Sequence, residues 1–197
     1  MKLIIYILKA GSLIFFIHNN FKIIKMFNER FAKSIFIITL LISLLLPIYF
    51  YVQLPERIAS HFNFNNEADG WMNKSSYLLF HFGMIFFFVI IFTGLSYLIP
   101  KFPVTLINLP NKDYWLNEKR KLFTFSLIKT LLYHLNSLCL ILFVVIDYLI
   151  YKANIDGTNK LWSFSWFIIL SFLFATGFLI IKFILFFNNK ENQMGEE

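Results

Sequence analysis

The sequence has 197 residues, of which 58% are hydrophobic, with a mean hydropathy of +0.67 and a formal net charge of +7. Soluble domains are usually about 45–50% apolar, so this composition predicts a protein solvated by lipid. The Lys and Arg residues cluster beside apolar segments and form no basic stripe, which argues against nucleic-acid binding. The single cysteine, Cys139, lies in an apolar stretch, so neither a disulfide framework nor a cysteine-based metal cluster is available.

Residues 1–25 open the chain with an apolar segment, Leu3 to Ile17, that Lys9 interrupts. A membrane span takes about 20 apolar residues, so this segment is too short for one. It also lacks a convincing signal-peptide cleavage site. Two interpretations stay open: an interfacial helix, or an upstream extension of a protein that begins at Met26.

Four later stretches are long and apolar enough to cross a bilayer as helices, because only helices pair every backbone group within lipid. They run from Ile35 to Val52, Tyr77 to Ile99, Leu127 to Ile150 and Leu161 to Phe187. We therefore predict an all-α transmembrane fold, a four-helix membrane bundle over residues 26–187. Residues 188–197 are polar, and we expect a disordered tail.

Positively charged residues in short connections are retained on the cytoplasmic side of a membrane. They are concentrated before the first span and between the second and third, at Lys22, Lys25, Arg30, Lys33, Lys101, Lys112, Lys119, Arg120 and Lys121. The other two connections hold only Arg57 and Lys74, and Lys152 and Lys160. The sequence thus predicts a multi-pass protein of the bacterial cell membrane, with both termini cytoplasmic and residues 53–76 and 151–160 outside.

The first outer connection, residues 53–76, has the most distinctive residue pattern in the chain. Asp69-Gly70 is a turn signal, and Trp71 suits the membrane interface, so we expect a short extracytoplasmic lid loop. Its pattern resembles the domain of unknown function 1648, a family that includes the SdpI-like immunity proteins. The residues that carry the resemblance are Leu54, Pro55, His61, Phe62, Asn63, Glu67, Asp69, Gly70, Trp71 and Lys74.

Two positions depart from the family pattern. Asn66 stands where the family usually has Gly, and Ala68 where it usually has Pro. Asn tolerates the left-handed backbone conformation, so we expect the turn to persist at Asn66. The resemblance implies immunity to a secreted toxic peptide, or sensing of it, although SdpI-like proteins usually have further helices.

A metal site is one alternative for this loop, with His61, Asp69 and His81 as possible ligands. The spacing does not require these three side chains to converge, and the other interpretation has His61 and Asp69 bonding to the loop backbone. No nucleotide-binding, hydrolase or zinc-protease motif is present. We therefore expect no catalytic residue, no metal and no cofactor, and classify the protein as a non-enzyme.

The connection between the second and third spans resembles the cytoplasmic loop of stand-alone members of the same family. The matching residues are Pro110, Asn111, Lys112, Asp113, Tyr114, Trp115, Leu116 and Arg120. We expect Tyr114 and Trp115 to anchor this loop at the headgroup boundary. Either the loop only fixes the spacing of the helices, or it docks phospholipid or another protein.

The third span carries Lys129, Tyr133, Asn136 and Asp147, which at 100° per residue share one face. One hypothesis makes this stripe a binding site or a relay between the membrane surfaces. The structural hypothesis has Asn136 bonding to a neighbouring helix while Lys129 and Asp147 reach opposite interfaces. Small residues predict packing faces at Gly83 with Gly94, and at Ser171 with Ala175.

We therefore predict a membrane protein whose partners are the lipid bilayer and a secreted peptide or membrane protein. A small-solute transporter component that uses the third-span stripe, and an accessory subunit of a larger membrane complex, are the alternatives.

Overall fold

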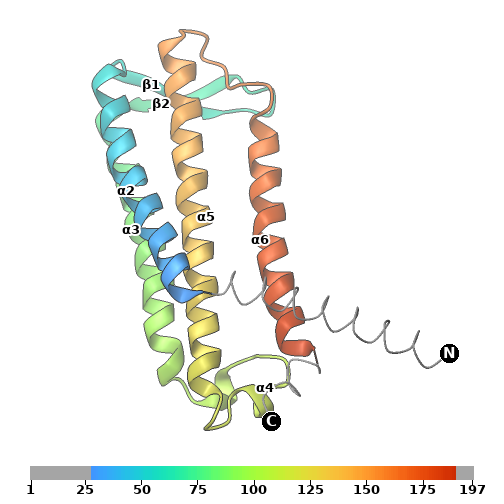
Figure 1. The fold of residues 1–197 in the computed structure, drawn as a ribbon. Coiled ribbons are helices and arrows are strands. Elements are labelled where there is room, and N and C mark those ends of the chain that lie inside the picture. Colours follow the sequence, from blue (N-terminus) through green and yellow to red (C-terminus); the bar gives the residue numbers. More distant parts are fainter. Residues whose placement is uncertain (1–27, 190–197) are drawn as a thin grey trace, which may run out of the picture.

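The computed structural model describes residues 28–189, which form long helices capped at one end by a two-stranded sheet (Figure 1). The long helices are α2 (Glu29–Gln53), α3 (Lys74–Leu98), α5 (Lys121–Ile155) and α6 (Ser165–Asn188). Within the described residues, these four are long and apolar enough to cross a membrane. The predicted all-α fold with four membrane helices is confirmed, and the interpretation of residues 1–25 lies outside the described residues.

The predicted spans differ from the helices mainly at the ends. Helix α5 extends beyond the predicted Leu127–Ile150 stretch on both sides, since residues 121–126 and 151–155 continue the helix. Helix α6 begins four residues later than predicted, since Leu161 to Phe164 belong to the connection that precedes it.

The shorter elements divide between the two ends of the bundle (Figure 1). Strands β1 (Arg57–Phe62) and β2 (Ala68–Asn73) form an antiparallel hairpin at what we call the hairpin end. The 3₁₀ turns η1 (Ile99–Lys101) and η2 (Val104–Leu106) and the one-turn helix α4 (Lys112–Trp115) lie at the opposite end, the α4 end.

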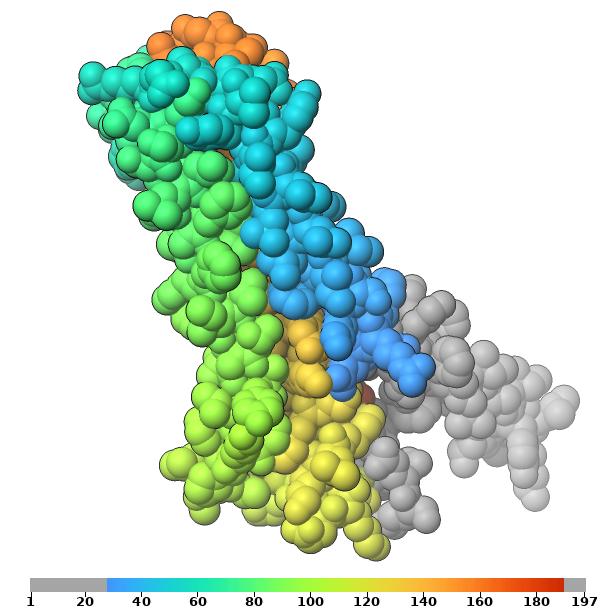
Figure 2. Space-filling view, turned by 90° about the vertical axis from the view of Figure 1, so that its left-hand side faces the viewer, coloured from blue at the N-terminus to red at the C-terminus, as the bar shows by residue number. Residues whose placement is uncertain are grey.

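Helix α5 is the centre of the packing. Helices α2 and α3 pack against it around Phe36, Ile85 and Leu140. Figure 2 shows α2 in blue and α3 in green side by side over one face of the molecule. Helix α6 packs mainly against α5 and is secured at the α4 end, where Phe187 is fully buried.

The predicted small-residue packing faces are wrong. A Cβ atom added at Gly83 or Gly94 would have no neighbour within 4 Å, so neither glycine allows a close helix contact. Ser171 and Ala175 line an open groove between α5 and α6, where no close packing of the two helices occurs.

Candidate functional site

The family loop folds as a β-hairpin, and its turn is at residues 63–67. The side-chain oxygen of Asn63 accepts hydrogen bonds from the backbone N–H groups of Asn65 and Glu67, at 2.9 and 3.0 Å. Asn66 has a φ of +61°, so the left-handed residue expected there is confirmed. The turn predicted at Asp69-Gly70 is wrong, because both residues lie inside β2.

Gly70 does not form a turn, but a glycine is required there because the two strands approach each other closely. A Cβ atom at Gly70 would lie 2.8 Å from the Cβ of His61, which is paired with it across the sheet. Beside this contact, His61 Nδ1 lies 2.5 Å from a carboxylate oxygen of Asp69. His61 and Asp69 therefore bond to each other, and the interpretation in which they hold the loop backbone is wrong.

Lys74 attaches the hairpin to the start of α3. Its ammonium group donates to the Leu54 carbonyl at 3.2 Å, lies 3.0 Å from the Glu56 carboxylate and sits over the Tyr51 ring. Leu54 is buried with Ile58 against α5. Leu54 and Lys74 thus position the hairpin on the bundle.

Side-chain contacts with α5, with α6 and with the connection between them fix the hairpin against the rest of the bundle. Asn154, in the last turns of α5, accepts from the Ala59 N–H at 2.8 Å and donates to the Ala59 carbonyl at 2.9 Å. Glu67 pairs with Lys160 at 2.8 Å, and Ser165 at the start of α6 donates to the Asn66 side chain at 2.7 Å. Asn154 could not be identified from the sequence, because its partner is a backbone group 95 residues away.

A buried polar network lies beneath the hairpin. Pro47 has no N–H, so the carbonyl of Ser43, four residues earlier in α2, loses its helical partner. His81 of α3 supplies the missing donor, with Nε2 lying 3.0 Å from that carbonyl. Because a carbonyl only accepts hydrogen bonds, Nε2 carries the hydrogen.

The other side of the His81 ring faces Asp147 of α5. His81 Nδ1 lies 2.7 Å from one Asp147 oxygen, and the Tyr77 hydroxyl donates to the other. The His81 and Asp147 side chains are 1% and 4% exposed. The prediction that Asp147 reaches the interface is wrong, because polar partners on α3 bind it inside the bundle.

The remaining residues of the predicted stripe do not form a continuous polar path. Lys129 pairs with Glu29 at 2.8 Å near the α4 end, and Tyr133 stacks on Phe36. Asn136 is fully buried, and its side-chain atoms have no hydrogen-bond partner in the structure. Between Asn136 and Asp147, about 16 Å apart along the helix, the face is occupied by the apolar Leu140 cluster.

The three side chains considered as possible metal ligands do not converge. His61 pairs with Asp69 in the hairpin, whereas His81 pairs with Asp147 within the bundle. Residues 28–189 contain no group of three or more His, Cys, Asp or Glu side chains that could hold a metal ion.

The connection between α3 and α5 closes the α4 end. The Trp115 indole N–H and the Asn111 amide donate to the Phe187 carbonyl at the end of α6, at 2.9 and 3.0 Å. Trp115 is 1% exposed, so its ring packs inside the protein and contacts α6. Arg120 lies over the Tyr114 ring at 4.0 Å. This connection therefore joins the end of α6 to the start of α5, with its Leu109 and Leu116 buried.

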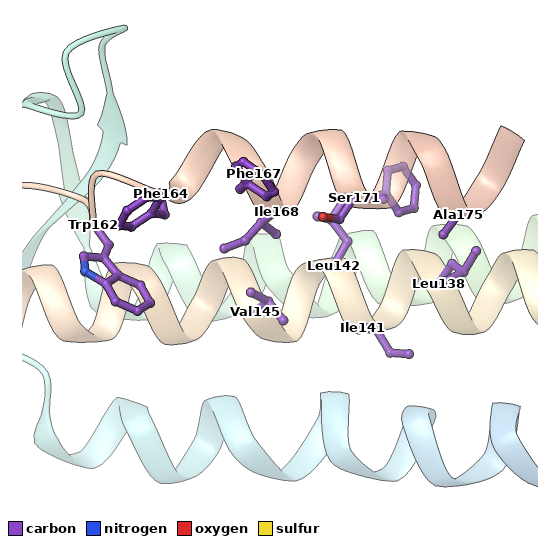
Figure 3. Close-up of a pocket in the computed structure, with 11 residues that line it drawn as sticks. Leu138, Ile141, Leu142, Val145, Trp162, Phe164, Phe167, Ile168, Ser171 and Ala175 are labelled. Carbon is purple, nitrogen blue, oxygen red and sulfur yellow. The ribbon is translucent and has the colours of Figure 1, made fainter. Parts of the chain in front are cut away.

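Three cavities lie along the contact between α5 and α6, towards the hairpin end. A cavity of about 220 Å³ beneath the hairpin is lined by Ser60, His61, Phe62, Asn63, Asn66, Ile146, Leu149, Ile150, Leu161, Ser165, Trp166, Ile168 and Ile169. An apolar groove of about 650 Å³ lies between α5 and α6 (Figure 3). A third cavity, of about 500 Å³, includes Lys152 and Lys160. We call them the hairpin cavity, the α5–α6 groove and the lysine cavity.

Residues 38–93 match the model of a family described as a domain of unknown function, DUF1648. The match covers most of α2, the whole hairpin and most of α3, and therefore includes Pro47 and His81. The recognition of this domain from the loop residues is confirmed over that segment. No curated protein and no solved structure matches the chain. The family match thus describes the segment 38–93, within a chain whose described residues include four helices long and apolar enough to cross a membrane.

Proposed function

We propose that this chain is a non-enzymatic protein of the bacterial cell membrane that binds a secreted amphipathic peptide at its hairpin end, outside the cell. The observation that carries the proposal is the hairpin cavity, which combines polar side chains of the hairpin with apolar side chains of α5 and α6. Small-molecule sites usually have about 300–1,000 Å³. A cavity of about 220 Å³ is better suited to one anchoring side chain of a peptide.

Exposed aromatic rings beside this cavity support a peptide ligand. Phe64, at the hairpin turn, is 85% exposed and stacks on Trp166 with 5.3 Å between ring centroids. Trp166 also lines the hairpin cavity. Aromatic side chains beside a cavity are typical of the centre of a peptide interface. The role follows the resemblance to the SdpI-like group: immunity to the peptide, or sensing of it.

The transporter alternative has less support. A solute path along α5 would need polar groups through the membrane, and Leu140 interrupts the stripe between Asn136 and Asp147. For the accessory-subunit alternative, the exposed apolar surface of α6 is equally consistent with lipid contact.

Gene deletion in the native bacterium tests the proposal, with peptide fractions of its own culture medium as the probe. We expect the deletion strain to be more sensitive to at least one fraction, and the wild-type gene to restore growth. Ile169→Trp, which fills the hairpin cavity, should fail to restore it. Leu170→Trp adds the same ring one residue away, outside that cavity, and should succeed.

Both variants must reach the membrane at wild-type levels, as measured by immunoblotting of membrane fractions. Equal sensitivity of the parent and deletion strains to every fraction would overturn the proposed role. Equal rescue by Ile169→Trp and Leu170→Trp would overturn the proposed site.

A further inference from the structure

We propose that the α5–α6 groove and the lysine cavity together bind one phospholipid with an anionic headgroup. This site adjoins the hairpin cavity, with which it shares the lining residues Leu149, Leu161 and Ile168. One acyl chain lies in the groove, and the phosphate lies near Lys152 and Lys160.

The lining of the groove fits a hydrocarbon chain. It is formed by Leu138, Ile141, Leu142, Val145, Trp162, Phe164, Phe167, Ile168, Ser171, Phe172 and Ala175. In Figure 3, Leu142 and Val145 of α5 lie on the side facing Ile168 and Ser171 of α6. Ser171 and Ala175 are small, which leaves room between the two helices. In a membrane, a groove of this composition is filled by apolar groups, because unfilled space forfeits dispersion contacts.

The length of the groove distinguishes an acyl chain from a helix. The α6 residues that line it end at Ala175, ten residues after the start of the helix at Ser165, or about 15 Å along the axis. This is half of a hydrocarbon core of about 30 Å, and so the depth of one leaflet. Towards the α4 end, α6 is secured to α5 by the cluster around Phe187 and Leu127. A transmembrane helix, including one of a second copy, would need a groove of the full depth.

The lysine cavity supplies a headgroup site at the end of the groove nearest the hairpin. Trp162 lines both spaces, so they adjoin at the membrane interface, where tryptophan is favoured. Lys152 pairs with Asp156 at 3.1 Å and Lys160 pairs with Glu67 at 2.8 Å. An ammonium group has three N–H donors, so each lysine retains donors for a phosphate oxygen.

Native mass spectrometry of the full chain, released from bilayers of mixed phosphatidylglycerol and phosphatidylcholine, tests this proposal. We expect one retained phospholipid per chain, enriched in phosphatidylglycerol. Ala175→Leu combined with Ser171→Leu should abolish retention by filling the groove. Gly177→Leu adds similar bulk on the same helix outside the groove lining, where a Cβ has no neighbour within 4 Å, and should retain the lipid.

The headgroup is tested by Lys152→Gln and Lys160→Gln. Each should reduce retained phosphatidylglycerol about fivefold while leaving phosphatidylcholine unchanged, as expected for one lysine beside an anionic lipid. Equal retention in the groove-filled variant and the Gly177→Leu control would overturn the site. A mass of two chains without lipid would instead assign the groove to a second copy. The growth assay above does not depend on these results, so the two proposals can fail separately.

Discussion

At the residue scale, the most informative position is Pro47, whose effect is seen on another helix. A proline within a span predicts an unpaired carbonyl four residues earlier, so Ser43 could be singled out from the sequence alone. The partner of the Ser43 carbonyl could not be identified from the sequence, because it is His81, 38 residues away on α3. The same limit applies to Asp147, whose helix face was predictable but whose partners on α3 depend on the packing of the bundle.

The proline-dependent role of His81 can be measured with a double-mutant cycle of Pro47→Ala and His81→Phe. Pro47→Ala restores an N–H for the Ser43 carbonyl, so His81→Phe should cost less stability in that background. We expect a coupling free energy of about 0.5–1.5 kcal/mol. His81→Phe also removes the contact with Asp147, but it does so with and without Pro47→Ala, so this loss cancels from the coupling free energy. Unfolding in detergent, followed by circular dichroism, is the measurement, and strictly additive effects would contradict the assignment.

The buried pair at Asp147 should matter far more to stability than the half-exposed pair at Lys129. Asp147→Leu leaves His81 and Tyr77 without their shared acceptor, and removing one partner of a buried pair costs about 3–5 kcal/mol. Lys129→Gln breaks a pair whose side chains are 38% and 33% exposed, and should cost less than about 1 kcal/mol. Comparable losses in the same unfolding assay would mean that Asp147 is not held as described.

At the element scale, the hairpin shows why local sequence signals were insufficient. Several residues between Asn63 and Gly70 favour turns, and Asp69-Gly70 is a strong signal by itself. The observed turn is at residues 63–67 because Asn63 caps it and Asn66 adopts the left-handed conformation. The pairing of Gly70 with His61 then places Asp69 and Gly70 within a strand. Strand register depends on such contacts across the sheet, which composition does not show.

Gly70→Ala should therefore open the hairpin without unfolding the helices. The added methyl group would lie 2.8 Å from His61 Cβ, and relieving the overlap should cost about 1–3 kcal/mol. Hydrogen exchange should become faster in residues 57–73 and stay unchanged in the central turns of α5. Gly83→Ala is the matched control, because its methyl group meets no atom within 4 Å. If hydrogen exchange in the hairpin of Gly70→Ala were unchanged, the overlap with His61 would be relieved without loss of stability, and the prediction would be wrong.

At the scale of the whole molecule, hydropathy predicted the membrane helices, because the energetic requirement to bury apolar segments in lipid is local to each segment. The groove between α5 and α6 depends on how far apart two helices lie, which no single segment encodes. Ser171 and Ala175 illustrate the difference. Their spacing indicated close helix packing, whereas the structure places both beside an open groove.

The orientation of the bundle is a property of all its connections taken together. The α4 end carries Arg30, Lys33, Lys101, Lys112, Lys119, Arg120 and Lys121. The hairpin end carries four, Arg57, Lys74, Lys152 and Lys160. Since positively charged connections are retained in the cytoplasm, we expect the hairpin to lie outside.

Cysteine labelling tests this orientation. In a Cys139→Ala background, Asn65→Cys places a thiol at the hairpin turn and Lys119→Cys places one at the α4 end. A maleimide that does not cross membranes should label the first in intact cells and the second only after permeabilisation. The reverse pattern would place the hairpin cavity in the cytoplasm, where it would not meet a secreted peptide. The same result would leave the lipid site intact but move it to the inner leaflet, because the depth of the groove is fixed relative to the hairpin end and not to the cell.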